Sequence, residues 1–154
     1  MWQLILLCAM WNLTEAGLVY QSLETKRSFV EEYSMSTMCM TVIMMTAFVM
    51  ALHLEVLLPP DVTVLQFIPL LIGLVIGWGY SRLKSDPANL LISLYNGAMG
   101  GLMGMMLGAV LQNPALCNIP IASQAMMELN TYSLVLFSAC LHVVVCHLLR
   151  FVNR

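Results

Sequence analysis

Charged side chains are scarce in this chain of 154 residues. It has 6 lysines and arginines and 8 aspartates and glutamates, which together make 9% of the residues, whereas a soluble domain usually carries about 25%. So few charges cannot cover a water-exposed surface, which excludes an ordinary soluble globule. The net charge of −2 also excludes a nucleic-acid-binding protein, because no basic patch is available to neutralise phosphates.

Catalytic and structural-metal motifs are absent as well. The sequence has no G-x-S-x-G elbow, no H-E-x-x-H pair and no phosphate-binding P-loop, and its acidic residues are isolated apart from Glu31 and Glu32. Its 5 cysteines form no C-x2-C pair, which leaves a structural zinc site without support. We therefore expect a protein that is not an enzyme and has no catalytic residues.

Apolar residues are abundant, at 60% of the chain, and four segments are long enough to cross a bilayer. A transmembrane helix needs roughly 20 mostly apolar residues, and the segments cover about residues 36–58, 62–80, 88–111 and 131–149. A helix satisfies its own backbone hydrogen bonds in lipid, which a single strand does not. We therefore predict an all-α, polytopic membrane protein with a single transmembrane domain over residues 1–154.

The N-terminal segment, about residues 2–20, has two interpretations. It either lies in the membrane interface as an amphipathic helix anchored by Trp2 and Trp11, or it forms a fifth span. A buried Glu15 costs about 2.5–3.5 kcal/mol in lipid unless it faces a partner, which favours the interfacial helix. No basic residue precedes the apolar run and no small-x-small cleavage site follows it, so a removable signal peptide is not expected.

The basic residues indicate an orientation. With four spans, all six fall on one side of the membrane: Lys26, Arg27, Arg82, Lys84, Arg150 and Arg154. Lysine and arginine are enriched in cytoplasmic loops, so the C-terminus is predicted to be cytoplasmic. We expect an integral protein of the bacterial inner (plasma) membrane.

The segment 88–111 has a face of small residues. Ser93 precedes the overlapping small-x3-small spacings of Gly97, Gly100, Gly101, Gly104 and Gly108. Such spacings let helix backbones approach closely in lipid, so this face is predicted to pack on another helix, in the same chain or in an oligomer. Ser85-Asp86-Pro87 predicts the start of this helix, and Pro69 predicts a kink in the preceding one.

Fourteen methionines suggest a soft-metal hypothesis. Thioether, thiolate and imidazole groups together favour Cu(I), and a set of them lies along the first long span: Met35, Met38, Cys39, Met50 and His53. The alternative is that methionine only fills irregular gaps between helices. His142 and Cys146 share a second helix face, separate from that of Cys140 and His147. His142 and Cys146 are predicted to form interhelical hydrogen bonds or to add ligands to the metal-binding set of the first long span.

Met40-x3-Met44, followed later by the glycine-rich helix, resembles the small copper-uptake transporters. That resemblance implies a trimer of three-helix subunits, with methionines lining a pore and glycines packing the last helix. Here the spans number four, and the pair lies in the first of them, so we assign no family. The run from Gly97 to Gly108 is also similar to segments of small bacterial membrane proteins with no assigned activity.

Two functions remain open from the sequence. The first is a non-enzymatic subunit, or an assembly or regulatory partner, of a membrane complex that packs through the glycine-rich helix. The second is binding or transport of a soft metal ion such as Cu(I) through the methionine, cysteine and histidine side chains. The expected partners are the lipid bilayer and either further copies of the chain or another membrane protein.

Overall fold

A computed structural model describes residues 2–25, 32–59, 65–83, 86–117 and 123–152. Within these ranges every regular element is a helix and there are no strands, which confirms the all-α prediction. The elements are α1 (Trp2–Thr25), α2 (Glu32–Leu57), η1 (Leu65–Phe67), α3 (Ile68–Ser81), α4 (Pro87–Gln112), η2 (Pro114–Cys117) and α5 (Gln124–Val152), where η marks a short 3-10 helix.

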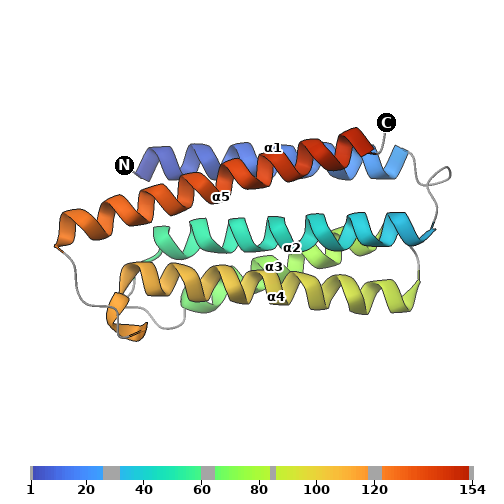
Figure 1. Cartoon of the computed structure of the whole chain (residues 1–154). Coiled ribbons are helices and arrows are strands. Elements are labelled where there is room, and N and C mark those ends of the chain that lie inside the picture. Colours follow the sequence, from blue (N-terminus) through green and yellow to red (C-terminus); the bar gives the residue numbers. More distant parts are fainter. Residues whose placement is uncertain (1, 26–31, 60–64, 84–85, 118–122, 153–154) are drawn as a thin grey trace.

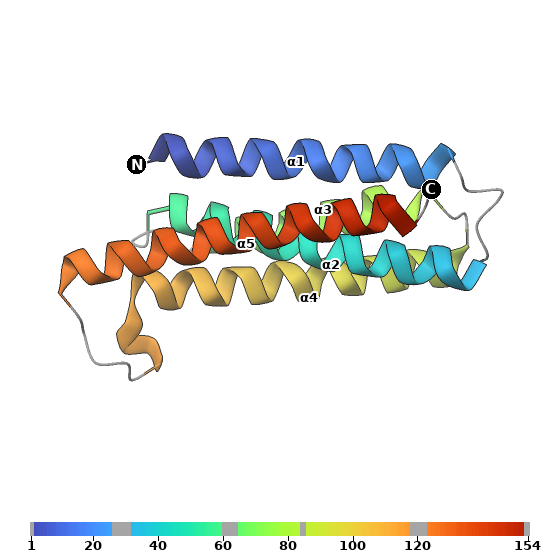
Figure 2. The same cartoon turned by 45° about the horizontal axis from the view of Figure 1, so that its top comes forward.

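The five α-helices lie roughly along one direction, and each runs opposite to the one before it (Figure 1). Helices α2, α3 and α4 pack closely together, whereas α1 and α5 lie side by side, parallel to each other, against α2 (Figure 2). Helix α2 contacts all four other helices. It is therefore the centre of the bundle, and α4 packs mainly against α2 and α3.

Four helices are long and apolar enough to cross a membrane, as expected of an integral membrane protein: α1, α2, α4 and α5. Three of the predicted spans, 36–58, 88–111 and 131–149, coincide with α2, α4 and α5. Residues 62–64 of the span predicted over 62–80 lie outside the described residues, and the rest of it corresponds to η1 and to α3, which has 14 residues. At 1.5 Å per residue α3 is about 21 Å long, shorter than a hydrocarbon core of about 30 Å.

Helix α1 has the dimensions of the fifth-span alternative. Its 24 residues give a length of about 36 Å, and it packs along α2 and α5. Asn12 and Glu15 are buried in that contact. The sequence favours an interfacial helix because it shows no partner for a buried Glu15, and in the structure Arg150 of α5 is that partner.

Proline and aspartate define where two helices begin. Pro69 lies in the first turn of α3, where its missing N–H needs no helical acceptor, so the predicted kink is wrong because the helix starts there. Asp86 is the N-cap of α4, and its carboxylate accepts a hydrogen bond from the N–H of Ala88 (3.3 Å). The predicted start of this helix is confirmed.

An aromatic contact ties α1 to α3. The Tyr80 hydroxyl donates a hydrogen bond to the carbonyl of Ala16 (2.7 Å), and the Tyr20 and Tyr80 rings meet edge to face at 5.3 Å. Around them lies the main cluster of buried apolar side chains, which includes Val19, Leu23, Met35, Met38, Cys39, Val42, Ile43, Leu83 and Cys146. This cluster joins α1, α2, α3 and α5 near the end of the bundle where the C-terminus lies (Figure 1).

Candidate functional site

The glycines of α4 form one of two contrasting contacts in the bundle, which we call the glycine seam. Gly97 and Gly101 lie against α3, where a Cβ on Gly97 would overlap the Gly73 carbonyl. Gly100, Gly104 and Gly108 lie against α2, and a Cβ on Gly104 would come within 2.8 Å of the Ala51 Cβ. The glycine face is thus occupied by α2 and α3 of the same chain, so a partner helix needs another surface.

The second contact, the polar seam, joins α1, α2 and α5 through the partly exposed Arg150 and through seven buried side chains: Asn12, Glu15, Thr46, His53, Ser138, His142 and Cys146. His142 lies at its centre and is fully buried. Its Nε2 is 3.0 Å from the Thr46 hydroxyl, and its Nδ1 is 3.0 Å from the Asn12 side-chain oxygen. Because an amide oxygen only accepts, Nδ1 carries the proton and donates it, and Thr46 donates to Nε2.

An ion pair extends the polar seam toward the C-terminal end. Arg150 of α5 donates to the carboxylate of Glu15 of α1, and the Glu15 side chain is 9% exposed. Cys146 lies between this pair and His142: its sulfur is 3.6 Å from the His142 Nε2. Such a partner lowers the cost of burying a carboxylate in lipid, so Glu15 and Arg150 hold α1 against α5.

Two further ionisable groups of α2 are buried near its C-terminal end. The His53 Nδ1 donates to the Val49 carbonyl (2.6 Å), while its Nε2 has no hydrogen-bond partner among the described residues. One carboxylate oxygen of Glu55 is likewise buried and unpartnered within the described ranges. Glu55 faces α4 rather than the polar seam, since its Cβ lies beside Gly108.

The residues predicted as soft-metal ligands do not gather at one point. Met35, Met38 and Cys39 lie in the apolar cluster, whereas Met50 and His53 lie farther along α2. From Cys39 to Met50 the helix rises about 16 Å, so the five side chains cannot coordinate one ion together. Within the described ranges no three His, Cys, Asp or Glu side chains are placed to hold a metal ion.

Methionines outside that ligand set come together elsewhere. A cavity of 420 Å³ between α2 and α4 is lined by Thr41, Met44, Met45, Phe48 and Met103. Thioethers alone are weak, soft ligands. Met106, one turn farther along α4, is exposed on the outer face of the bundle.

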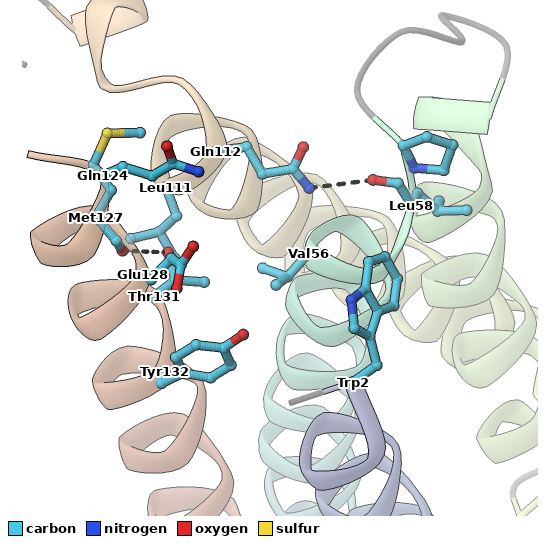
Figure 3. Close-up of a pocket in the computed structure, with 11 residues that line it drawn as sticks. Trp2, Val56, Leu58, Leu111, Gln112, Gln124, Met127, Glu128, Thr131 and Tyr132 are labelled. Atoms are coloured by element: carbon cyan, nitrogen blue, oxygen red, sulfur yellow. Dashed lines mark hydrogen bonds between the residues drawn. The ribbon is translucent and has the colours of Figure 1, made fainter.

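Two hollows are lined in part by α1 and α5. The outer cavity, of 470 Å³, lies at the end of the bundle opposite the C-terminus and is lined in part by Trp2, Val56, Gln112, Glu128, Thr131 and Tyr132. In Figure 3 the side chains of Glu128 and Tyr132 on α5 face Val56 and Trp2 across it. The α1–α5 groove, of 540 Å³, opens on the outer side of the bundle and is lined by Leu4, Leu7, Trp11, Asn12, Leu136, Cys140 and Val144.

The polar seam was only partly foreseen from the sequence. The interhelical hydrogen bonds predicted for His142 are present, and Cys140 and His147 lie on the exposed side of α5. Asn12 and the Glu15–Arg150 pair were missed. The sequence contains a signal for the α5 side of the seam only. His142, Cys146 and Arg150 repeat every four residues and so share one face of α5.

The chain was compared with protein-family models, with curated proteins and with solved structures, and no significant match was found in any of the three.

Proposed function

We propose that this protein is a non-enzymatic subunit, or an assembly or regulatory partner, of a membrane complex, and that the partner binds in the α1–α5 groove. The observation that carries the proposal is a buried hydrogen-bond donor in an otherwise apolar groove. Asn12 is the one amide in the described lining, and its Nδ2 has no hydrogen-bond partner among the described residues.

An unpaired donor is costly inside a bilayer, because no water is present to satisfy it. The Asn12 side-chain oxygen is used by His142, so the amide cannot turn over without losing that bond. Because Asn12 is 1% exposed, an acceptor brought in by a partner would satisfy the donor after the groove side chains that cover it shift aside. Polar side chains that pair across apolar helix faces are a common means of association in membranes.

The occupant we propose is a transmembrane helix of a second membrane protein, with a serine, threonine, asparagine or glutamine side chain at the depth of Asn12. The groove follows two parallel helices, which suits an elongated apolar ligand. Its exposed large side chains, such as Leu7 and Trp11, provide a surface into which helix side chains can interdigitate.

The orientation is part of the same proposal. Arg82 is the C-cap of α3 and Arg150 lies in the last turn of α5, and α3 and α5 end at the same end of the bundle (Figure 1). Lys26, Arg27, Lys84 and Arg154 lie outside the described residues. The positive-inside rule then supports a cytoplasmic C-terminus in a bacterial plasma membrane. A reporter enzyme that is active only outside the cytoplasm should be inactive when fused after the C-terminal residue and active when fused after Leu116.

Photo-cross-linking tests the docking site. A photoreactive amino acid replaces Leu136 in the groove or, as a matched control, Leu91, which is 71% exposed on α4. We expect the groove position alone to cross-link to a transmembrane helix of one other protein, with a hydrogen-bond acceptor at the cross-linked depth. The variant Cys140→Trp, which fills the groove, should abolish this product, whereas Leu91→Trp should not.

Three results would contradict the proposal: cross-links to lipid only, cross-links to a second copy of this chain, or equal partner cross-linking from both positions.

Soft-metal binding is the second candidate, and the cavity lined by Met44, Met45 and Met103 favours it. Metal analysis of the purified protein after exposure to Cu(I) tests this candidate. Stoichiometric copper that is lost on Met44→Leu and Met103→Leu supports a site in this cavity, and loss on Met50→Leu and His53→Leu supports the set predicted from the sequence. Absence of bound copper overturns both.

A further inference from the structure

A further cavity, which we call the α1–α3 cavity, is separate from the hollows described above. Its volume is 490 Å³, within the range of about 300–1,000 Å³ that is usual for ligand pockets. Residues of α1 and α3 form most of its wall, with Thr46 of α2 between them. The lining residues that bear on its occupant are Leu13, Gly17, Val75, Trp78, Gly79 and Arg82.

Two glycines leave the α1–α3 cavity open. Gly17 of α1 and Gly79 of α3 both line it, and a Cβ added to either glycine would meet no atom within 4 Å. The glycines of the glycine seam differ, because a Cβ there would overlap a neighbouring helix. The space beside Gly17 and Gly79 is therefore not filled by any described part of the chain.

The interior of the α1–α3 cavity suits an apolar occupant that enters from the lipid. Its two buried hydroxyl groups are already used, since Thr46 donates to His142 and Tyr80 donates to the carbonyl of Ala16. On the outer side, Val75 is 62% exposed and Trp78 is 51% exposed, so the cavity borders the surrounding acyl chains. An empty apolar space forfeits contacts on its lining, which an acyl chain would restore.

A cationic side chain also lines this cavity. Arg82 is the C-cap of α3 and is exposed, and its guanidinium carbon lies 4.0 Å from the centroid of the Trp78 ring. Within the described residues no carboxylate forms an ion pair with Arg82. Asp86, the acidic residue nearest to it in the sequence, caps α4 instead. The Arg82 guanidinium is therefore available to an anion.

We propose that the α1–α3 cavity binds one anionic phospholipid, with an acyl chain beside Gly17 and Gly79 and the phosphate on Arg82. The planar guanidinium group matches the oxygens of a phosphate, and Trp78 stacked on it is typical of the boundary between acyl chains and headgroups. A polar solute would find no free partner on the two buried hydroxyls, and an apolar helix would bring no anion to Arg82. The site is separate from the α1–α5 groove, so a lipid and a partner helix can bind together.

Native mass spectrometry of the full chain in detergent tests the proposal. Phosphatidylglycerol or phosphatidylcholine with the same acyl chains is added, and the dissociation constant of the first bound lipid is measured. We expect one phosphatidylglycerol to bind roughly fivefold more tightly than phosphatidylcholine, as for one arginine near an anionic lipid surface. Arg82→Gln should remove this preference, and Arg82→Lys, which keeps the charge, should retain it.

A second variant tests the place of the acyl chain. Gly79→Leu has room for its side chain but fills the cavity, so it should fold and lose bound lipid of either kind. The matched control is Ser133→Leu, which adds the same side chain at an exposed position of α5 and should bind lipid as the parent does. Glycerol 1-phosphate, which has a phosphate and no acyl chain, should not displace the phosphatidylglycerol.

Four results would overturn the proposal, each from protein with the parent's helical circular dichroism. They are equal affinity of the parent for the two lipids, an undiminished preference in Arg82→Gln, lipid retained by Gly79→Leu, and displacement of the lipid by glycerol 1-phosphate.

Discussion

The glycine seam and the polar seam hold the same central helix, α2, in opposite ways. In the glycine seam the side chains are absent, and the backbones of α2, α3 and α4 touch directly. In the polar seam the side chains carry the contact, through His142, Thr46, Asn12 and the Glu15–Arg150 pair. One contact depends on shape alone, and the other depends on specific polar partners.

This difference suggests that the glycine seam stabilises the fold and that the polar seam is the candidate for function. Close packing of small residues stabilises helices in lipid by dispersion, and it leaves no group available for chemistry. The polar seam places ionisable groups in a solvent that disfavours them. Helices α2, α3 and α4 therefore form the scaffold, and α1 and α5, together with Thr46 and His53 of α2, provide the buried polar groups.

The largest expected effect is a clash in the glycine seam. Gly104→Leu places its side chain against the Phe48 carbonyl and the Ala51 Cβ, and because part of this is backbone, neighbouring side chains cannot simply turn away. We expect a loss of about 3 kcal/mol or more in the free energy of unfolding, measured by denaturant titration in detergent.

The control for this clash is another glycine. Gly79→Leu and Gly17→Leu have no atom within 4 Å of an added Cβ, so they should gain about 0.5–1 kcal/mol from helix propensity. Equal losses at Gly104 and Gly79 would mean that the seam is not a close backbone contact.

A smaller effect is expected from breaking the ion pair of the polar seam. Glu15→Gln leaves the Arg150 guanidinium without its carboxylate. Removing one partner of a fully buried ion pair lowers the free energy of unfolding by about 3–5 kcal/mol. We expect about 2 kcal/mol, since 25% of the Arg150 side chain is exposed.

A double-mutant cycle measures this pair. Glu15→Gln with Arg150→Gln should recover part of the loss, because no charge is then left unpaired. If the two single losses simply add, the pair contributes nothing and the polar seam is held by other contacts.

A third change separates the two faces of α5. His142→Leu removes the partner of Thr46 and Asn12 and should lower the free energy of unfolding by about 1 kcal/mol, as for hydrogen bonds within membranes. His147→Leu lies on the exposed face and should change it by less than about 0.5 kcal/mol. Unfolding of both variants is followed in the same detergent, and similar values for the two would place His142 outside any stabilising contact.

Local composition predicted the helices well. Apolar length located α2, α4 and α5, and Asp86-Pro87 located the start of α4. These features depend on neighbouring residues, so a sequence contains them directly. The length of α3 could not be predicted from the sequence, because apolar residues continue on both sides of Pro69 and do not show where the helix begins.

The polar seam could be predicted only in part, for a physical reason. Periodicity shows that His142, Cys146 and Arg150 share a face, but it does not show which helix lies opposite. Glu15 and Arg150 are 135 positions apart in the sequence, and many helix arrangements satisfy the same apolar pattern. In the sequence alone, the cost of burying an unpaired Glu15 disfavours a membrane-spanning α1. In the structure Arg150 pairs with Glu15, so this cost no longer counts against a spanning helix.

The smallest expected effect is on the face of α4 that points away from the glycine seam. Met106 is exposed there, and Met103 is partly covered at the edge of the methionine cavity. Replacing either by leucine keeps the volume, so the free energy of unfolding should change by less than about 0.5 kcal/mol. Gly104→Leu changes the opposite face of the same helix. A large loss in the free energy of unfolding there and a small one here would show that α4 contributes to stability through its glycines. If Met103→Leu instead removes bound copper at unchanged stability, the outer face of α4 has a chemical role that packing alone does not require.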